Sequence, residues 1–253
     1  RRRDQPRQPK GHQDSLHLLE MSRASRVTRT HFITGTGTGA GKTILTALLL
    51  DHLRAQGENA IAIKPICTGP RDDVRLLQSL QSGALSDDEM NPFHYQKPVT
   101  PLVASRRRLK KEHIVSAIRQ REGECERLLV EGAGGLRVPL AAGVAWDDVV
   151  KTLKCGVIVA APNRLGVLNH VNLTLDRLKT TGVKRVFVVL SDHCPPSRMD
   201  ASAASNERVL VGFWPNTPFL RLPYLGSNLG TSEKIRAARK KTKKTLARLV
   251  SLL

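Results

Sequence analysis

The chain has 253 residues, of which 40% are hydrophobic, and it carries a formal net charge of +19. This length fits one large α/β domain with a buried core, and the hydrophobic content excludes disorder throughout. No apolar run approaches the roughly 20 residues that a membrane-spanning helix needs, so we expect a soluble, cytoplasmic protein without a membrane partner.

The positive charge is concentrated at the two ends of the chain. Residues 1–30 carry eight Lys or Arg against three acidic residues, and residues 231–253 carry eight against one. We interpret these runs as solvated charge. Because neither end contains an aromatic side chain on which a base could stack, a nucleic-acid partner is not expected.

The amino-terminal segment and the cysteines bear on processing and compartment. Residues 1–28 show neither helical periodicity nor the apolar segment of a secretory signal, so we expect them to be disordered or extraneous, with translation starting at Met21. The four cysteines are widely spaced and form no CxxC pair. This spacing excludes a zinc-finger pattern and favours free thiols in a reducing compartment.

From residue 29 onward, apolar strand-like segments alternate with helical ones. The expected strands are HFIT (31–34), NAIAIKPI (59–66), RLLVEG (127–132), VIVAAP (157–162) and VFVVLS (186–191). Helices are expected at 44–57, 72–81, 110–120 and 168–182, with a turn-rich segment at 91–101. This alternation is typical of a parallel sheet covered on both faces. We predict a single doubly wound α/β domain over residues 29–230, followed by a basic helix at 231–253.

The nine residues GTGTGAGKT, from Gly35 to Thr43, lie between the first strand and the first helix. In this context the glycines allow backbone N–H groups to surround an anion at the helix N-terminus. Lys42 would reach the terminal phosphates, and the Thr43 hydroxyl would bind magnesium. The leading glycine lies six residues before Gly41, not five as in GxxxxGK[ST]. The segment predicts a nucleotide-binding loop of the P-loop NTPase type.

Three charged residues near the ends of the predicted elements are further candidates for the site. Lys64 comes just after the second strand, and a lysine there can neutralise a transferring phosphoryl group, although such a lysine can also be an ordinary surface residue. Glu131 leaves a buried strand beside flexible glycines, which suits a magnesium ligand. Asp73 starts a helix, where an acid also stabilises the helix N-terminus.

Taken in order, these segments resemble the dethiobiotin synthetase family. That family combines GTxTxxGKT with a YKP-type segment, an acidic helix start, an NP…P segment, VEGAGG and LGxxNHxxLT. Here the segments read GTGTGAGKT, IKPICTG, RDDVRLLQ, NPFHYQKPVTP, LLVEGAGGLRVPL and RLGVLNHVNLT. The resemblance covers residues 30 to 230, and the ordered set is far more specific than any one segment.

The resemblance implies an ATP- and Mg²⁺-dependent ligase of biotin biosynthesis. It would form dethiobiotin from 7,8-diaminononanoate and CO2 through a phosphorylated carbamate. The implied catalytic residues are Lys64, Lys42 and Thr38, the implied magnesium ligands are Thr43, Asp73 and Glu131, and the implied substrate contacts are Thr38, Lys64, Thr68 and Asn169. The implied nucleotide contacts are Gly39, Ala40, Gly41, Lys42, Thr43, Ile44, Asp73, Glu131, Gly132, Ala133, Gly134, Ser191, Asp192, Pro223, Tyr224 and Leu225. Because the family holds the substrate's carboxylate across a dimer interface near LGVLN, a homodimer is also implied.

Two positions depart from the family pattern, and three alternatives stay open. Gly37 stands where an aspartate is common, and Ser191 precedes Asp192 where an Asn–Asp pair usually recognises the base. A cobyrinate-type amide synthase would need a further glutaminase domain, for which the chain has no room. A partitioning-type ATPase that binds nucleic acid or membrane carries an early loop lysine, which residues 35–41 lack. A non-catalytic relative is the third alternative.

Overall fold

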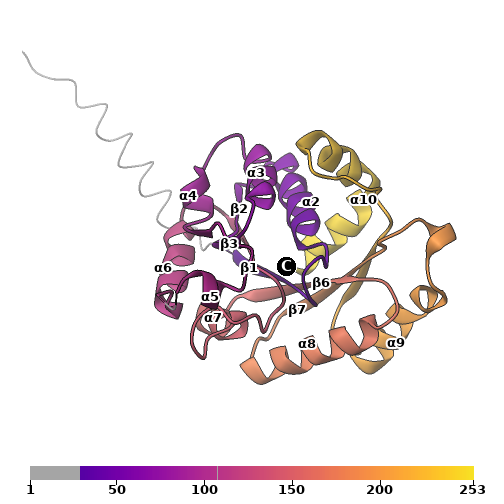
Figure 1. Cartoon of the computed structure of the whole chain (residues 1–253). Coiled ribbons are helices and arrows are strands. Elements are labelled where there is room, and N and C mark those ends of the chain that lie inside the picture. The colour runs from indigo at the N-terminus through magenta and orange to yellow at the C-terminus, as the bar shows by residue number, and fades with distance from the viewer. Residues whose placement is uncertain (1–28, 107) are drawn as a thin grey trace, which may run out of the picture.

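The computed structural model describes residues 29–106 and 108–253. The expectations for residues 1–28, including a start at Met21, concern residues outside the described part of the chain. The described residues form a six-stranded sheet with helices packed on both of its faces (Figure 1).

The six strands of the main sheet are all parallel, in the order β2-β5-β1-β6-β7-β8. They are β1 (Arg29–Gly35), β2 (Ala60–Ile63), β5 (Arg127–Glu131), β6 (Gly156–Pro162), β7 (Val186–Ser191) and β8 (Phe219–Leu222). Most of their side chains are buried, because helices cover both faces of the sheet. The predicted doubly wound parallel sheet is therefore confirmed, and β8 is an additional edge strand.

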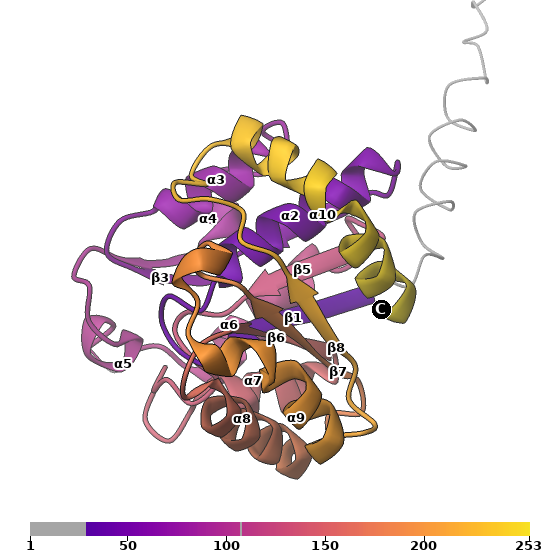
Figure 2. The ribbon, with the colours of Figure 1, turned by 90° about the vertical axis from the view of Figure 1, so that its right-hand side faces the viewer.

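The helices form one layer on each face of the sheet. They are α2 (Lys42–Ala55), α3 (Asp72–Ser79), α4 (Asp87–Met90), α5 (Pro101–Ala104), α6 (Lys111–Arg121), α7 (Trp146–Leu153), α8 (Val167–Thr181), α9 (Asn206–Phe213) and α10 (Ser232–Leu252). Two short 3₁₀ helices span Pro196–Arg198 and Ala201–Ala204. Figure 2 shows α2, α3 and α10 on one side of the sheet and α7, α8 and α9 on the other.

The segment predicted as one strand over residues 59–66 is divided in two. β2 ends at Ile63, and Lys64 and Pro65 interrupt the strand. Proline has no N–H to donate to a ladder, which explains the break. The chain continues as β3 (Ile66–Thr68), which pairs in parallel with β4 (Phe93–Tyr95) in a separate two-stranded sheet.

The basic segment near the carboxyl end forms α10, which packs along α2. Its apolar face is buried, through Ile235, Ala238, Thr242, Leu246 and Leu249. Two of its arginines face Asp51 of α2: Arg239 forms an ion pair with it, and Arg236 Nε lies 3.8 Å from its Oδ1. Among the described residues, no helix is both long enough and apolar enough to span a membrane.

Candidate active site

The carboxyl ends of three neighbouring strands bring charged side chains together. β1 lies beside β5, with Ile33 opposite Glu131. β5 in turn lies beside β2, with Val130 opposite Ile63. Lys64 follows Ile63 directly, and the glycine loop follows β1. The strand register therefore places the loop, Lys64 and Glu131 at one edge of the sheet, where ligands of such folds bind.

The loop between β1 and α2 has a conformation that depends on its glycines. Gly39 and Gly41 have φ angles of 73° and 85°, in the left-handed region where other residues are strained. Gly35 is needed for a different reason, because a Cβ there would lie 2.9 Å from Ala40 Cβ and 3.1 Å from Lys42 Cγ. The glycine six residues before Gly41 is thus the one that lets the loop pack closely on itself.

Lys42 folds back over the loop that precedes it. Its Nζ donates a hydrogen bond to the carbonyl oxygen of Gly37 over 3.0 Å, and its side chain is buried. Burial lowers the pKa of Lys42, while the carboxylate of Glu131 opposes this effect. From this position the ammonium group can contact a phosphate held by the loop.

Glu131 connects the glycine loop to Lys64. Its Oε1 accepts hydrogen bonds from Thr43 Oγ1 over 2.7 Å and from Lys64 Nζ over 2.9 Å. Lys64 also forms an ion pair with Asp73 at the start of α3. Burial alone would lower the pKa of Lys64, but Glu131 and Asp73 outweigh burial and raise this pKa above its usual value. Lys64 is therefore a fixed cation between two carboxylates.

The same residues offer the oxygen atoms that a magnesium ion prefers. Glu131 is fully buried, and its Oε2 has no hydrogen-bond partner among the described residues. Such an oxygen is costly unless a cation or ligand satisfies it. Thr43 adds a hydroxyl, and Asp73 adds a carboxylate whose side chain is 46% exposed. This oxygen-only set fits magnesium, although the described residues include no group of three or more His, Cys, Asp or Glu that could hold a metal.

Two adjoining hollows lie at this edge of the sheet. The first, of about 390 Å³, is lined by residues that include Thr38, Gly39, Gly41, Lys42, Thr43, Ile44, Lys64, Asp73 and Gly134. All three predicted catalytic residues, Lys64, Lys42 and Thr38, line it. The hollow thus extends from the glycine loop to Lys64 and Asp73, which follow β2 in the sequence.

The second hollow, of about 150 Å³, lies between the glycine loop and the carboxyl ends of β7 and β8. Its lining includes Gly39, Ala40, Gly41, Ile44, Ser191, Asp192, Pro223, Tyr224 and Leu225. These residues come from three distant parts of the sequence, and they all belong to the predicted nucleotide contacts. Because Gly39, Gly41 and Ile44 line both hollows, one elongated ligand can occupy the two together.

Two polar residues that the sequence analysis missed hold Asp192 in the second hollow, and a third holds one of these two. Arg221 Nε lies 3.0 and 3.1 Å from the two carboxylate oxygens, and Asn163 Nδ2 donates to Oδ1 over 2.8 Å. Asn206 Nδ2 in turn donates to Asn163 Oδ1 over 3.0 Å, and both asparagines are buried. A single sequence carries no periodic or spacing signal for these contacts, because they form only once β6, β7 and β8 are adjacent.

The turn after β5 is held in place by contacts with β1 and α7. Gly132 packs against Phe32, and a Cβ at Gly132 would lie 2.7 Å from the aromatic ring. The carbonyl oxygen of Ala133 accepts a hydrogen bond from Trp146 Nε1 over 2.9 Å. Gly132 and Ala133 therefore fix the turn, while Gly134 lines the first hollow.

Two predicted substrate contacts are not among the residues that line either hollow of the described chain. Thr68 is half-buried in β3, where it pairs with Tyr95 of β4. Asn169 is exposed near the start of α8.

Comparison with known proteins places these features in a family. A family model described as an AAA domain matches residues 29–224. The ATP-dependent dethiobiotin synthetase of Akkermansia muciniphila is 32% identical over 188 residues, which cover 73% of this chain and 87% of the relative. The protein of the same name from Anaeromyxobacter sp. is 33% identical over 201 residues, which cover 77% and 89% of the two chains.

Solved structures share the fold at low sequence identity. The MinC:MinD cell division protein complex of Aquifex aeolicus matches with a TM-score of 0.55 and 12% identity, covering 86% of this chain and 96% of that one. A nucleotide-binding protein of Archaeoglobus fulgidus, solved in complex with ADP, matches with a TM-score of 0.52 and 18% identity, covering 87% and 90%. These two similarities concern the fold alone.

Proposed function

We infer that this chain, which belongs to the dethiobiotin synthetase family, closes the cyclic urea of dethiobiotin in an ATP-dependent reaction. The substrates are 7,8-diaminononanoate and CO2. The observation that carries this proposal is the position of Lys64, which is ion-paired with Asp73 and hydrogen-bonded to Glu131, next to Thr43 of the glycine loop. A buried cation beside a phosphate-binding loop suits a reaction in which a carboxylate-like group is phosphorylated.

The proposed reaction has three steps. One amine of the substrate adds to CO2 and loses a proton, which gives a carbamate. A carbamate oxygen then attacks the terminal phosphorus of ATP, and ADP leaves. Finally the second amine attacks the carbamate carbon and loses a proton, and phosphate leaves as the ring closes. Negative charge develops on the carbamate and the phosphoryl group, so the main task of the protein is to position these groups and to stabilise charge.

We assign these tasks to the residues at the carboxyl edge of the sheet. Backbone N–H groups of the glycine loop and Lys42 hold the phosphates of ATP. Lys64 stabilises the carbamate and the mixed anhydride that forms from it, and Thr38 contacts the substrate. Thr43, Asp73 and Glu131 hold Mg²⁺, which when bound would neutralise charge on the phosphates.

The base of the nucleotide is proposed to lie in the second hollow. Tyr224 and Leu225 supply apolar contacts, and Asp192 is held in place by Arg221. Ser191, where the family usually has asparagine, offers only a hydroxyl to the base. We therefore expect nucleotide choice to differ from that of a relative that carries the Asn–Asp pair.

We propose that the protein acts as a homodimer. Asn169 is exposed, and the apolar residues four positions away on either side are also exposed: Leu165 by 78% and Leu173 by 61%. Exposed apolar side chains next to a predicted substrate contact suit an interface with a second copy of the chain. Across it, Asn169 would contact the carboxylate tail of the substrate bound in the partner, while Thr68 would contact the substrate within its own chain.

The proposed setting is the cytoplasm, with small-molecule partners and without a membrane or nucleic acid. All four cysteines lie in the described part of the chain and form no disulfide there, as is usual in a reducing compartment. Part of the cationic charge of α10 is used within the fold, because Arg236 and Arg239 face Asp51.

A direct assay tests this function. Purified protein is incubated with the diamine, ¹³C-bicarbonate, Mg²⁺ and ATP, and the product is analysed by mass spectrometry. We expect dethiobiotin with one ¹³C atom, released with one equivalent of phosphate. Lys64→Met should abolish the product, whereas the same change at the exposed Lys97 should not. Phosphate release without the labelled cyclic urea would contradict the proposal.

A further inference from the structure

The backbone of Lys64 is held by Met90 and Asn91, where the NP segment begins, and the proposed reaction uses neither residue. The N–H of Lys64 donates to the carbonyl oxygen of Met90 over 3.0 Å. The carbonyl oxygen of Lys64 accepts a hydrogen bond from Asn91 Nδ2 over 2.8 Å. Lys64 and Asn91 are both buried, so water cannot replace this bond.

The other end of the Asn91 side chain contacts the residue that precedes α3. Its Oδ1 accepts a hydrogen bond from Arg71 Nε over 3.1 Å. The orientation of the amide is unambiguous, because the carbonyl of Lys64 can only accept and the guanidinium of Arg71 can only donate. Asn91 therefore joins the end of β2 to the start of α3, where Asp73 lies in the first turn.

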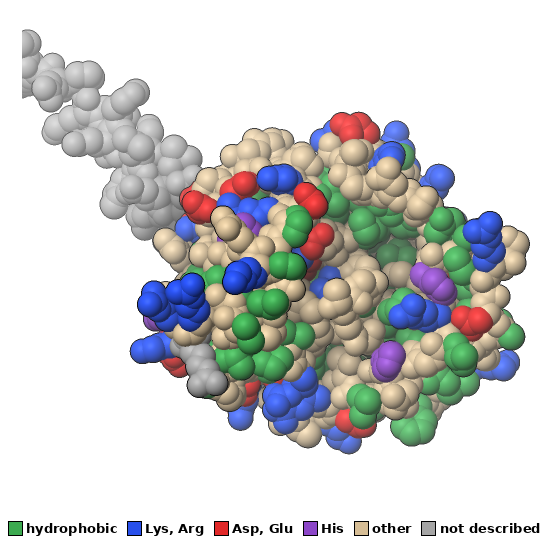
Figure 3. Space-filling view, viewed as in Figure 1, with side chains coloured by type: hydrophobic (Ala, Val, Ile, Leu, Met, Phe, Trp, Pro, Cys, Tyr) green, Lys and Arg blue, Asp and Glu red, His purple; other side chains and the backbone are tan. Residues whose placement is uncertain are grey.

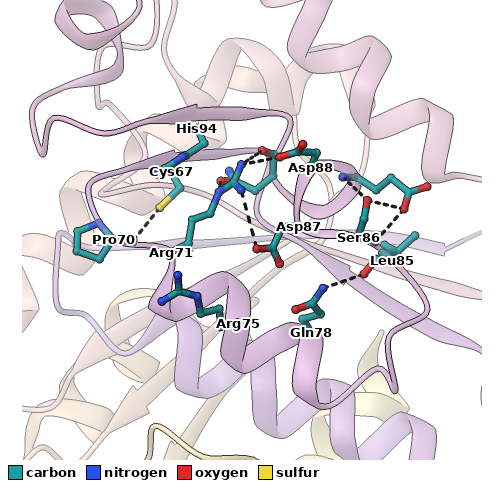
Figure 4. Close-up of polar contacts among 12 residues, drawn as sticks. Cys67, Pro70, Arg71, Arg75, Gln78, Leu85, Ser86, Asp87, Asp88 and His94 are labelled. Carbon is teal, nitrogen blue, oxygen red and sulfur yellow. Dashed lines mark hydrogen bonds and ion pairs between the residues drawn. The ribbon is translucent and has the colours of Figure 1, made fainter.

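Arg71 is itself anchored on its far side. Its Nη2 donates to Asp88 Oδ1 over 2.8 Å, and its Nη1 lies 3.9 Å from Asp87 Oδ2. Figure 4 shows the Arg71 side chain extending from the start of α3 toward these two residues of α4. Figure 3 shows the resulting group of acidic and basic side chains over α3 and α4. The guanidinium thus has partners on α4 and on Asn91.

This arrangement bears on the reaction because Lys64 and Asp73 come from separate elements. Lys64 is buried at the end of a strand, whereas Asp73 is on a short helix and is half-exposed. Their relative position depends on how α3 is fixed against β2, and a displacement of about 1 Å at a reacting group can cost on the order of 100-fold in rate. Asn91 and Arg71 span this gap with side-chain hydrogen bonds.

We propose that Asn91, oriented by Arg71, is a positioning residue that sets the distance between Lys64 and Asp73. This inference rests on the proposed function, in which Lys64 stabilises the carbamate and Asp73 holds the metal. Neither Asn91 nor Arg71 lines the hollows described above, so both act through the residues that they hold.

Two variants separate the contact of Asn91 with Lys64 from its contact with Arg71. Asn91→Asp keeps an acceptor for Arg71 but places an oxygen against the carbonyl of Lys64, so the bond to β2 is lost. Arg71→Met keeps the bond between Asn91 and Lys64 but releases α3. The matched control is Arg75→Met: Arg75 lies one turn further along α3 (Figure 4), is 68% exposed and contacts only the exposed Asp72 among the described residues.

Kinetics and NMR together test the proposal, at a temperature where urea or thermal unfolding shows each variant to be fully folded. We expect Asn91→Asp and Arg71→Met to lower kcat at least tenfold while the KM for ATP stays within twofold, and Arg75→Met to leave both unchanged. A purely structural role would lower the melting temperature and leave kcat per folded molecule unchanged. That result would overturn the proposal.

The ammonium group of Lys64 gives a readout that does not depend on activity. Because it is buried and ion-paired, its protons exchange slowly with water and should give a separate ¹⁵N-edited signal, identified by its loss in Lys64→Arg. Asn91→Asp and Arg71→Met should shift or broaden this signal, and Arg75→Met should not. An unchanged signal in both would refute the positioning role. If the parent protein made no dethiobiotin, the proposed function would fail, while the signal would still decide whether Asn91 positions Lys64.

Discussion

Thr43 at the start of α2 and Glu131 at the end of β5 are hydrogen-bonded to each other over 2.7 Å, although 88 positions separate them in the sequence. The same oxygen of Glu131 accepts the hydrogen bond from Lys64. The glycine loop, the central strand and the lysine beyond β2 therefore meet at one carboxylate. A change at Glu131 should affect the loop and the lysine together.

Glu131→Gln should lower kcat by about 100-fold, close to 2.7 kcal/mol of transition-state stabilisation. The substitution preserves the shape of the side chain but removes the charge that faces Lys64 and the unpartnered oxygen assigned to Mg²⁺. The Mg²⁺ concentration needed for half-maximal rate should rise at least tenfold. Initial rates across a Mg²⁺ titration measure both effects. The control Glu112→Gln changes an exposed residue of α6 and should behave like the parent. Overlapping titration curves for Glu131→Gln and the parent would contradict the ligand assignment.

Two glycines of the loop should respond differently to the same substitution. A Cβ at Gly35 would lie 2.9 Å from Ala40 Cβ, whereas a Cβ at Gly37 would have no described atom within 4 Å. Gly35→Ala should therefore cost about 1–3 kcal/mol in the free energy of unfolding and weaken nucleotide binding. Gly37→Ala should change the free energy of unfolding by less than about 0.5 kcal/mol. Urea unfolding followed by circular dichroism compares the two variants, and equal midpoints would show that the close approach at Gly35 does not matter.

The stability of the protein should fall as the pH is lowered from 6.5, in part because of His31. This side chain is fully buried in β1, and its ring nitrogens have no hydrogen-bond partner among the described residues. Burial, followed by the nearby cations Arg127 and Arg185, lowers the pKa of His31 from 6.5 to about 4. Above pH 6.5 the ring is neutral in both states and contributes no pH dependence. Between pH 6.5 and 4 the unfolded chain binds a proton that the folded protein does not, so stability falls by about 1.4 kcal/mol per pH unit.

Replacing the imidazole isolates this effect. Between pH 6.5 and 5, the free energy of unfolding should fall by about 1–2 kcal/mol less in His31→Leu than in the parent. The free energy of unfolding in urea at each pH is the measurement. His113→Leu removes an exposed histidine of α6 and should leave the parent's slope unchanged. Parallel pH profiles for His31→Leu and the parent would show that folding does not lower the pKa of His31.

The sequence predicts those parts of the fold that repeat a pattern over several residues. The continuous apolar segments of β6 and β7 and the helix over α8 fall where they are expected, because burial on both faces of a sheet requires such segments. β8 and α7 were not predicted. β8 has only four residues, and Arg221 interrupts its apolar run. In α7 the apolar residues Trp146, Val149, Val150 and Leu153 do have helical spacing, so this helix carried a signal that the sequence analysis overlooked.

The residues of the candidate site also divide into those that the sequence predicts and those that it does not. The glycine loop, Lys64 and Glu131 could be located because each lies at the end of a strand or directly after it, and parallel strands all end at one edge. Asn91, Asn163 and Arg221 could not be located, because their partners lie 20 to 43 positions away or because, as for Arg221, the residue itself is on a strand that was not predicted. Thus Asn91 contacts the carbonyl of Lys64 27 positions earlier, and Arg221 contacts Asp192 29 positions earlier.

The packing of α10 on α2 has a consequence for nucleotide binding. α2 begins with Lys42 and Thr43, the residues proposed to contact the phosphates and the metal, and α10 (232–252) packs along it. A protein shortened before residue 232 would expose leucines of α2 to water and leave Asp51 without its two arginines. The last helix thus supports the helix that begins at the glycine loop, even though almost two hundred positions separate the two along the chain.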